Sequence, residues 1–191
     1  ALAGADRLEL CDNPAEGGTT PSYGYLKKVR EKLDIPLFPI IRPRGGHFVF
    51  TPDEKQAMRH DIELCKSMGF DGVVIGLLNA DGKVDYEETA ACTELAYPME
   101  VTFHRAFDRA TDMDEALETI IKAGCTRILT SGQYPDVNKA DTVIRSLIKA
   151  ADSRIIIMPG SGVASASVTQ LAQSTGATEF HASARLVVNK P

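Results

Sequence analysis

The chain has 191 residues, of which 43% are hydrophobic and 25% are charged, and its formal net charge is −5. This length is sufficient for one substantial hydrophobic core. The acidic balance and the lack of any basic run argue against a nucleic-acid-binding protein. No apolar stretch reaches transmembrane length, and the first six residues lack the basic region and apolar core of a signal peptide. The composition therefore predicts a globular protein with neither nucleic-acid nor membrane partners.

The cysteines indicate a reducing compartment. There are four of them, far apart in the sequence, at Cys11, Cys65, Cys92 and Cys125. Paired spacing is absent, so we interpret them as reduced thiols of a cytoplasmic protein rather than as a disulfide framework.

Apolar or β-branched runs alternate with helical patterns along the whole chain. The spacing of these runs is roughly 30 residues, which is the size of a βαβ unit. No linker or shift in composition divides the chain, so we expect one domain over residues 1–191. The runs begin near Arg7, Pro36, Gly72, Met99, Arg127, Arg154 and Thr178.

The clearest helix start is Thr51, with Pro52 at the first helical position and Glu54 completing a capping box. Apolar residues then recur at helical spacing as far as Gly69, a residue that suits a helix end. Similar signals predict further helices that start near Thr20, Asp112 and Ser165.

Strict alternation of strands and helices predicts an α/β fold with parallel strands, either a TIM-type (β/α)₈ barrel or an open doubly wound sheet. The barrel is favoured, because no Gly-x-Gly-x-x-Gly turn marks a dinucleotide crevice. A barrel of eight strands needs one more than the seven runs. Residues 1–6 look like the last turn of a helix, so we expect the first strand to precede Ala1. Residues 185–191 are too few for a covering helix, so we also expect the carboxyl end to be incomplete.

Several strand ends carry motifs that together resemble the CutC family. Each motif is weak alone, but their order and spacing hold from residue 4 to residue 185. The resemblance implies a TIM barrel, a cytoplasmic location and a role in copper homeostasis. The tail, residues 186–191, departs from the family's longer loop and final helix. The motifs are Gly4–Cys11, Glu16–Ser22, Ile41–Gly46, Thr102–Asp108, Leu129–Gly132, Met158–Gly162 and Glu179–Ala184.

Copper(I) favours thiolate and thioether ligands, and the sequence has no Cys-x-x-Cys or Met cluster. Cys65, Cys92 and Cys125 lie in or beside helical segments, where cysteine usually packs as a small hydrophobe. Cys11 ends a strand on the expected pocket face. It is the one weak candidate for a copper(I) ligand, alone or between protomers of a homo-oligomer, although structural packing is a competing interpretation. No other cofactor is expected.

Four charged or ionisable residues are expected to converge at the carboxyl end of the barrel, because side chains alternate along a strand and ligands bind at that end. They form either a salt-bridge network that closes the barrel or a catalytic set with histidine as acid or base. His47 and His60, by contrast, are expected on the surface. The four candidate catalytic residues are Glu9, Arg42, His104 and His181.

Two glycine turns predict an anion-binding site, because the loops after the last two strands of TIM barrels often bind phosphate and glycine exposes backbone N–H groups. The competing interpretation is that these glycines only permit tight turns. The candidate anion-binding residues are Ser131, Gly132, Gly160, Ser161, Gly162 and Ser183.

Three functions remain open from the sequence. The family resemblance implies a cytoplasmic copper-homeostasis or copper-binding protein. The arginine, histidine and glycine residues at strand ends favour a TIM-barrel enzyme acting on a small anionic or phosphorylated metabolite. A barrel that serves as an interaction scaffold is the third, since this fold hosts many unrelated activities.

Overall fold

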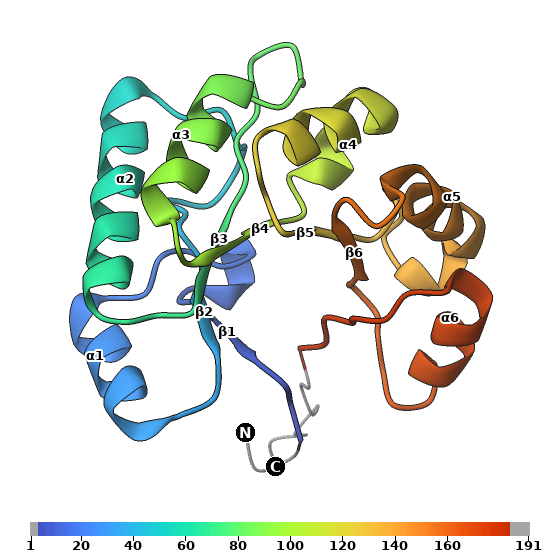
Figure 1. The fold of residues 1–191 in the computed structure, drawn as a ribbon, viewed down its shortest axis with the longest axis horizontal. Coiled ribbons are helices and arrows are strands. Elements are labelled where there is room, and N and C mark those ends of the chain that lie inside the picture. The colour runs from blue at the N-terminus through green and yellow to red at the C-terminus, as the bar shows by residue number, and fades with distance from the viewer. Residues whose placement is uncertain (1–3, 184–191) are drawn as a thin grey trace.

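The computed structural model describes residues 4–183, in which strands and helices alternate (Figure 1). Three short 3-10 helices, η1 (Pro14–Glu16), η2 (Phe107–Arg109) and η3 (Val137–Lys139), lie in the connections. The main elements in chain order are β1 (Leu8–Leu10), α1 (Tyr23–Lys32), β2 (Leu37–Pro39), α2 (Pro52–Ser67), β3 (Gly72–Ile75), α3 (Tyr86–Ala96), β4 (Glu100–Phe103), α4 (Met113–Lys122), β5 (Arg127–Thr130), α5 (Asp141–Ala151), β6 (Ile156–Pro159) and α6 (Val168–Thr175).

All pairings between the six named strands are parallel. β1 pairs with β2, and β3 to β6 form a sheet in chain order. A parallel bridge between Ile40 and Val74 connects the two sheets. The strands follow an arc, and α1 to α6 lie on its outer side (Figure 1). The predicted TIM-type α/β barrel is confirmed.

The seventh predicted run is shorter than expected. It contributes a single bridge, between Gly160 and His181, rather than a strand of the described part. A helix turn was expected at residues 1–6, and positions 1–3 of it lie outside the described residues. The incomplete tail expected at residues 185–191 lies entirely outside them.

The capping signals of the sequence locate two helix starts correctly and two with a small shift. Thr51 and Glu54 form the predicted capping box of α2, and Asp112 caps α4. α1 is capped by Ser22 instead of Thr20, because the Thr20 hydroxyl accepts a hydrogen bond from the Arg42 backbone N–H at 2.9 Å.

The start of α6 is shifted as well. The helix begins at Val168, with Ser167 as its N-cap, instead of near Ser165. The carbonyl of Ala164 accepts hydrogen bonds from the N–H groups of Ser167 and Val168, so residues 164–167 form a separate turn before the helix.

Alternation along the strands separates two environments. The outward-facing residues join the main hydrophobic core beneath the helices, while Phe38, Ile40 and Val74 form a small apolar cluster of their own. Phe38 lies beside two arginines, with Arg7 Cζ 5.7 Å and Arg127 Cζ 5.4 Å from its ring centroid.

These arginines belong to an ion-pair network at the amino ends of the strands. One Glu179 oxygen lies 2.5 Å from Arg7 Nη2 and 3.1 Å from Arg127 Nε, and Arg127 Nη1 lies 2.6 Å from Glu100. Burial alone would raise the pKa of Glu179, but Arg127 and Arg7 hold that pKa below its ordinary value. The network compensates the charge of Arg127, whose side chain is only 5% exposed.

Candidate functional site

Glu9 and His181 meet inside the barrel, as their predicted strand faces require. His181 Nε2 lies 3.3 Å from a Glu9 carboxylate oxygen, and both side chains are half-buried. Gly160 makes room mainly for Leu129, because a β-carbon there would lie 2.4 Å from Leu129 Cδ1, and it would also lie 3.2 Å from the His181 β-carbon.

Arg42 extends from the end of β2 and is buried, with 4% of its surface exposed. Its Nη1 donates hydrogen bonds to the carbonyls of Glu16 at 2.8 Å and Gly18 at 3.0 Å, and its Nη2 donates to the carbonyl of Gly46 at 2.8 Å. Arg42 therefore ties the β1–α1 loop to the β2–α2 loop.

His104 follows β4 and is also buried, with 5% of its surface exposed. Its Nδ1 accepts a hydrogen bond from the Ala106 N–H at 3.1 Å, so the ring hydrogen of the neutral imidazole resides on Nε2. Burial, reinforced by the charge of Arg42, lowers the pKa of His104 from 6.5 to about 3. At neutral pH His104 is a hydrogen-bond donor, and it is not suited to accept a proton.

Phe48, on the β2–α2 loop, contacts both of these residues. Its ring centroid lies 4.8 Å from Arg42 Cζ and 5.0 Å from the His104 ring centroid. Arg42 Nε and His104 Nε2 are both buried, and within residues 4–183 neither has a hydrogen-bond partner. The four predicted catalytic residues thus lie as two pairs, Glu9 with His181 and Arg42 beside His104.

Cys11 lies just beyond β1 and is exposed, unlike the other three cysteines. It packs beside Gly18, where a β-carbon would lie 3.7 Å from its sulfur. Burial raises the pKa of Cys65, Cys92 and Cys125 to about 12. No group of three or more histidine, cysteine or acidic residues in the described part of the chain is placed to hold a metal ion.

The amides around Ser131 and Gly132 already bind a carboxylate of the chain itself. Asp108 accepts hydrogen bonds from the N–H groups of Ser131 at 3.1 Å and Gln133 at 3.2 Å, and from the hydroxyl of Thr130 at 2.5 Å. Arg105 pairs with the same carboxylate at 2.7 Å. This role of Asp108 could not be predicted from the sequence, although the residue belongs to a motif at the end of β4.

The Gly160–Gly162 turn packs against the loop after β5. The Ser161 hydroxyl donates to the Pro135 carbonyl at 2.9 Å, and the Gly162 carbonyl accepts from Asn138 Nδ2 at 2.9 Å. Residues 163–167 separate the turn from α6, so the turn does not open directly onto the helix amino end. Ser183 is exposed. Anion binding at this turn stays a prediction.

Comparison with known proteins identifies the family. The model of the CutC family matches residues 1–186. A family protein CutC from Chromobacterium violaceum is 52% identical over 182 residues, which cover 95% of this chain and 74% of that protein. The chain belongs to the CutC family.

A human relative of the chain is named copper homeostasis protein cutC homolog. It is 45% identical over 182 residues, which cover 95% of this chain and 67% of the human protein. The solved structure of CutC from Streptococcus agalactiae superposes with a TM-score of 0.89 at 34% identity, covering 94% of this chain and 89% of that chain. Deoxyribose phosphate aldolase from Aeropyrum pernix, at 19% identity and a TM-score of 0.61, shares the fold.

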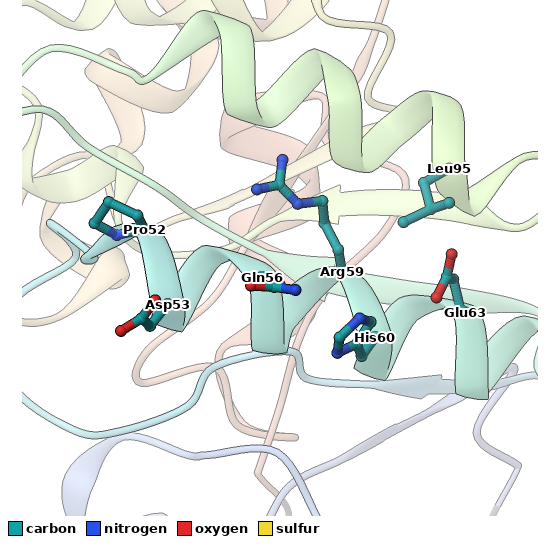
Figure 2. Close-up of a pocket in the computed structure, with 7 residues that line it drawn as sticks. All are labelled: Pro52, Asp53, Gln56, Arg59, His60, Glu63 and Leu95. Carbon is teal, nitrogen blue, oxygen red and sulfur yellow. The ribbon is translucent and has the colours of Figure 1, made fainter.

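An open groove of about 500 Å³ lies in the helical layer between α2 and α3, and its lining includes Arg59, His60 and Leu95. Figure 2 shows Arg59 extending from α2 toward α3, where it pairs with Glu88. Long charged side chains and wide exposure make this groove a poor site for a small ligand. No helix of the described residues is long and apolar enough to cross a membrane.

Proposed function

We propose that this protein acts in copper homeostasis in the cytoplasm, with the Cys11 thiol as its contact for copper(I). The observation that carries the proposal is the exposure of Cys11 at the carboxyl end of β1, while the other three thiols are buried. The name of the human relative supports the same process.

A single thiolate is an incomplete copper(I) site, because this ion is bound tightly by several soft ligands together. We therefore propose that copper(I) is bound weakly by one chain or shared between Cys11 residues of two copies in a homo-oligomer. In either case copper(I) is cargo rather than a resident cofactor.

A copper(I) titration against a competing chelator, under reducing conditions, tests this function. We expect binding to disappear in Cys11→Ser and to persist in the control Cys65→Ala, which removes a buried thiol. Sedimentation with and without copper(I) then separates the weak site from the shared one. Equal copper(I) affinity in the wild type and Cys11→Ser would refute the assignment.

A second candidate function is an enzyme acting on a small anionic or phosphorylated metabolite. The specific observation in its favour is the buried pair Arg42 and His104 at the carboxyl ends of β2 and β4, where TIM-barrel enzymes bind their substrates. A thermal-shift screen of metabolites tests it, because a specific ligand raises the apparent stability by mass action. If no metabolite and no copper(I) raises the melting temperature, the interaction scaffold is the function that remains.

A further inference from the structure

We propose that Arg42 Nε–H and His104 Nε2–H together bind an oxyanion group, a carboxylate or a phosphate, of a small ligand. This inference rests on the second proposed function, because it names the part of the metabolite that the barrel mouth recognises. It places the anion at the ends of β2 and β4 rather than at the Gly160–Gly162 turn.

The two donors lack acceptors. Arg42 Nε and His104 Nε2 are both buried without a hydrogen-bond partner in residues 4–183. A buried donor that lacks an acceptor destabilises the folded protein, and such groups are rare in native structures. Two of them at one place indicate that an acceptor completes the site.

The order of the strands brings the two donors together. β3 lies between β2 and β4 in the barrel, and it is followed by Gly76. A β-carbon at Gly76 would lie 2.2 Å from His104 Cε1, so the missing side chain lets the imidazole lie across β3 toward Arg42. The Phe48 ring contacts both Arg42 and His104, so the two side chains lie close to each other.

The charge around Arg42 also favours an anion. Arg42 donates its Nη atoms only to neutral backbone carbonyls, and within residues 4–183 it forms no ion pair with a carboxylate. Burial and the charge of Arg44 lower the pKa of Arg42, and the nearby Glu16 carboxylate offsets this only in part. A bound oxyanion would add further negative charge. His104 stays neutral far below neutral pH, because burial and the nearby charge of Arg42 lower its pKa, so it offers a donor without adding charge.

Phe48 covers the proposed site. Its backbone carbonyl accepts a hydrogen bond from the Leu78 N–H at 2.9 Å, which fixes the β2–α2 loop over the end of β3. A ligand reaches the two donors when the Phe48 side chain swings away from them. The Phe48 side chain is partly exposed, so it has room to rotate while the loop backbone stays in place.

Nuclear magnetic resonance of the side-chain N–H groups tests the proposal in the full chain. Inorganic phosphate and acetate are the two probes, titrated separately into the ¹⁵N-labelled protein to millimolar concentrations. Arg42→Lys keeps the charge but removes Nε–H together with the Nη hydrogen bonds to three loop carbonyls. Arg44→Lys on the same loop is the matched control, because Arg44 also donates to three loop carbonyls but pairs with Glu54. His104→Phe keeps the ring without its donor.

We expect the signals of Arg42 Nε–H and His104 Nε2–H to shift in a saturable way with at least one probe. The probe that acts distinguishes a phosphate-binding from a carboxylate-binding site. Affinity should fall about tenfold or more in Arg42→Lys and His104→Phe, since each loses one hydrogen bond to a charged group. Arg44→Lys should bind as the wild type does.

Signals that do not move with either probe would overturn the proposal, and so would equal affinity in Arg42→Lys and the wild type. The enzyme function is tested separately by the metabolite screen. A metabolite that raises the melting temperature while both signals stay fixed refutes this subsite but not that function. Saturable shifts with phosphate or acetate, when no metabolite raises the melting temperature, support the subsite and count against the enzyme.

Discussion

The imidazole of His104 lies against the α-carbon of Gly76. A β-carbon at that glycine would come within 2.2 Å of His104 Cε1 and 2.3 Å of His104 Nδ1. The backbone of Gly76 is not in the left-handed region, so the requirement for glycine comes from this contact. Gly76 therefore positions His104.

Replacing Gly76 by alanine should push the His104 ring from its position and lower the free energy of unfolding by about 1–3 kcal/mol, as overpacking of a core does. Urea denaturation measures this change. The control is Gly24→Ala in α1, where a β-carbon meets nothing within 4 Å. That change should leave stability unchanged or raise it by up to about 1 kcal/mol. Equal effects of the two substitutions would show that the Gly76 contact is unimportant.

Stability should also depend on pH through His104. Its pKa is about 3 in the folded protein and 6.5 in the unfolded chain, so between these values the unfolded state binds the extra proton. Stability is therefore full above pH 6.5 and falls as the pH is lowered through this window. The loss at about pH 5, where most carboxylates are still ionised, should be about 2 kcal/mol.

Urea denaturation of the wild type and of His104→Phe over this pH range measures that contribution. Between neutral pH and about pH 5, the variant should lose about 2 kcal/mol less stability than the wild type does. Parallel profiles of stability against pH would mean that folding does not lower the pKa of His104.

The ion-pair network at the amino ends of the strands should contribute strongly to stability. Arg127→Ala removes the buried partner of Glu179 and Glu100, and we expect a loss of about 3 kcal/mol or more in the free energy of unfolding. Arg154→Ala removes an exposed pair with Glu118 and should cost about 1 kcal/mol or less. A small effect of Arg127→Ala, measured in the same urea titrations, would show that Arg7 alone compensates Glu179.

The four thiols should differ sharply in reactivity. In the folded protein a thiol reagent should modify Cys11, since it is the exposed cysteine of the four. Cys65, Cys92 and Cys125 should react only after denaturation, because they are buried and their pKa values are raised to about 12. Mass spectrometry of peptides identifies the modified residues. Early modification of a buried cysteine would indicate local opening of the structure around it.

The periodic part of the fold could be predicted from the sequence. Strand alternation correctly placed Glu9 and His181 on one inner face, and their contact at 3.3 Å follows from it. The capping box at Thr51 was visible because its residues lie three positions apart. These features depend on local spacing, which the sequence displays directly.

Other features depend on contacts between distant loops and have no periodic signal. Phe48 lies in an irregular loop, and only the folded chain shows that it contacts both Arg42 and His104. The carboxylate of Asp108 binds the Ser131 N–H, 23 positions further along the chain. An anion-binding turn and a turn that holds an internal carboxylate have the same local sequence pattern, so the sequence could not separate them.

We propose that the barrel mouth, the carboxyl ends of β1 and β2 with Cys11 and Arg42, is the functional site of the chain. The most direct test is to follow backbone amide signals during a copper(I) titration under reducing conditions. We predict that the shifts concentrate at Cys11, at Gly18 beside it, and in the two loops that Arg42 connects, β1–α1 and β2–α2. Shifts that gather instead at the groove between α2 and α3, or no shifts at a saturating copper(I) concentration, would contradict the claim.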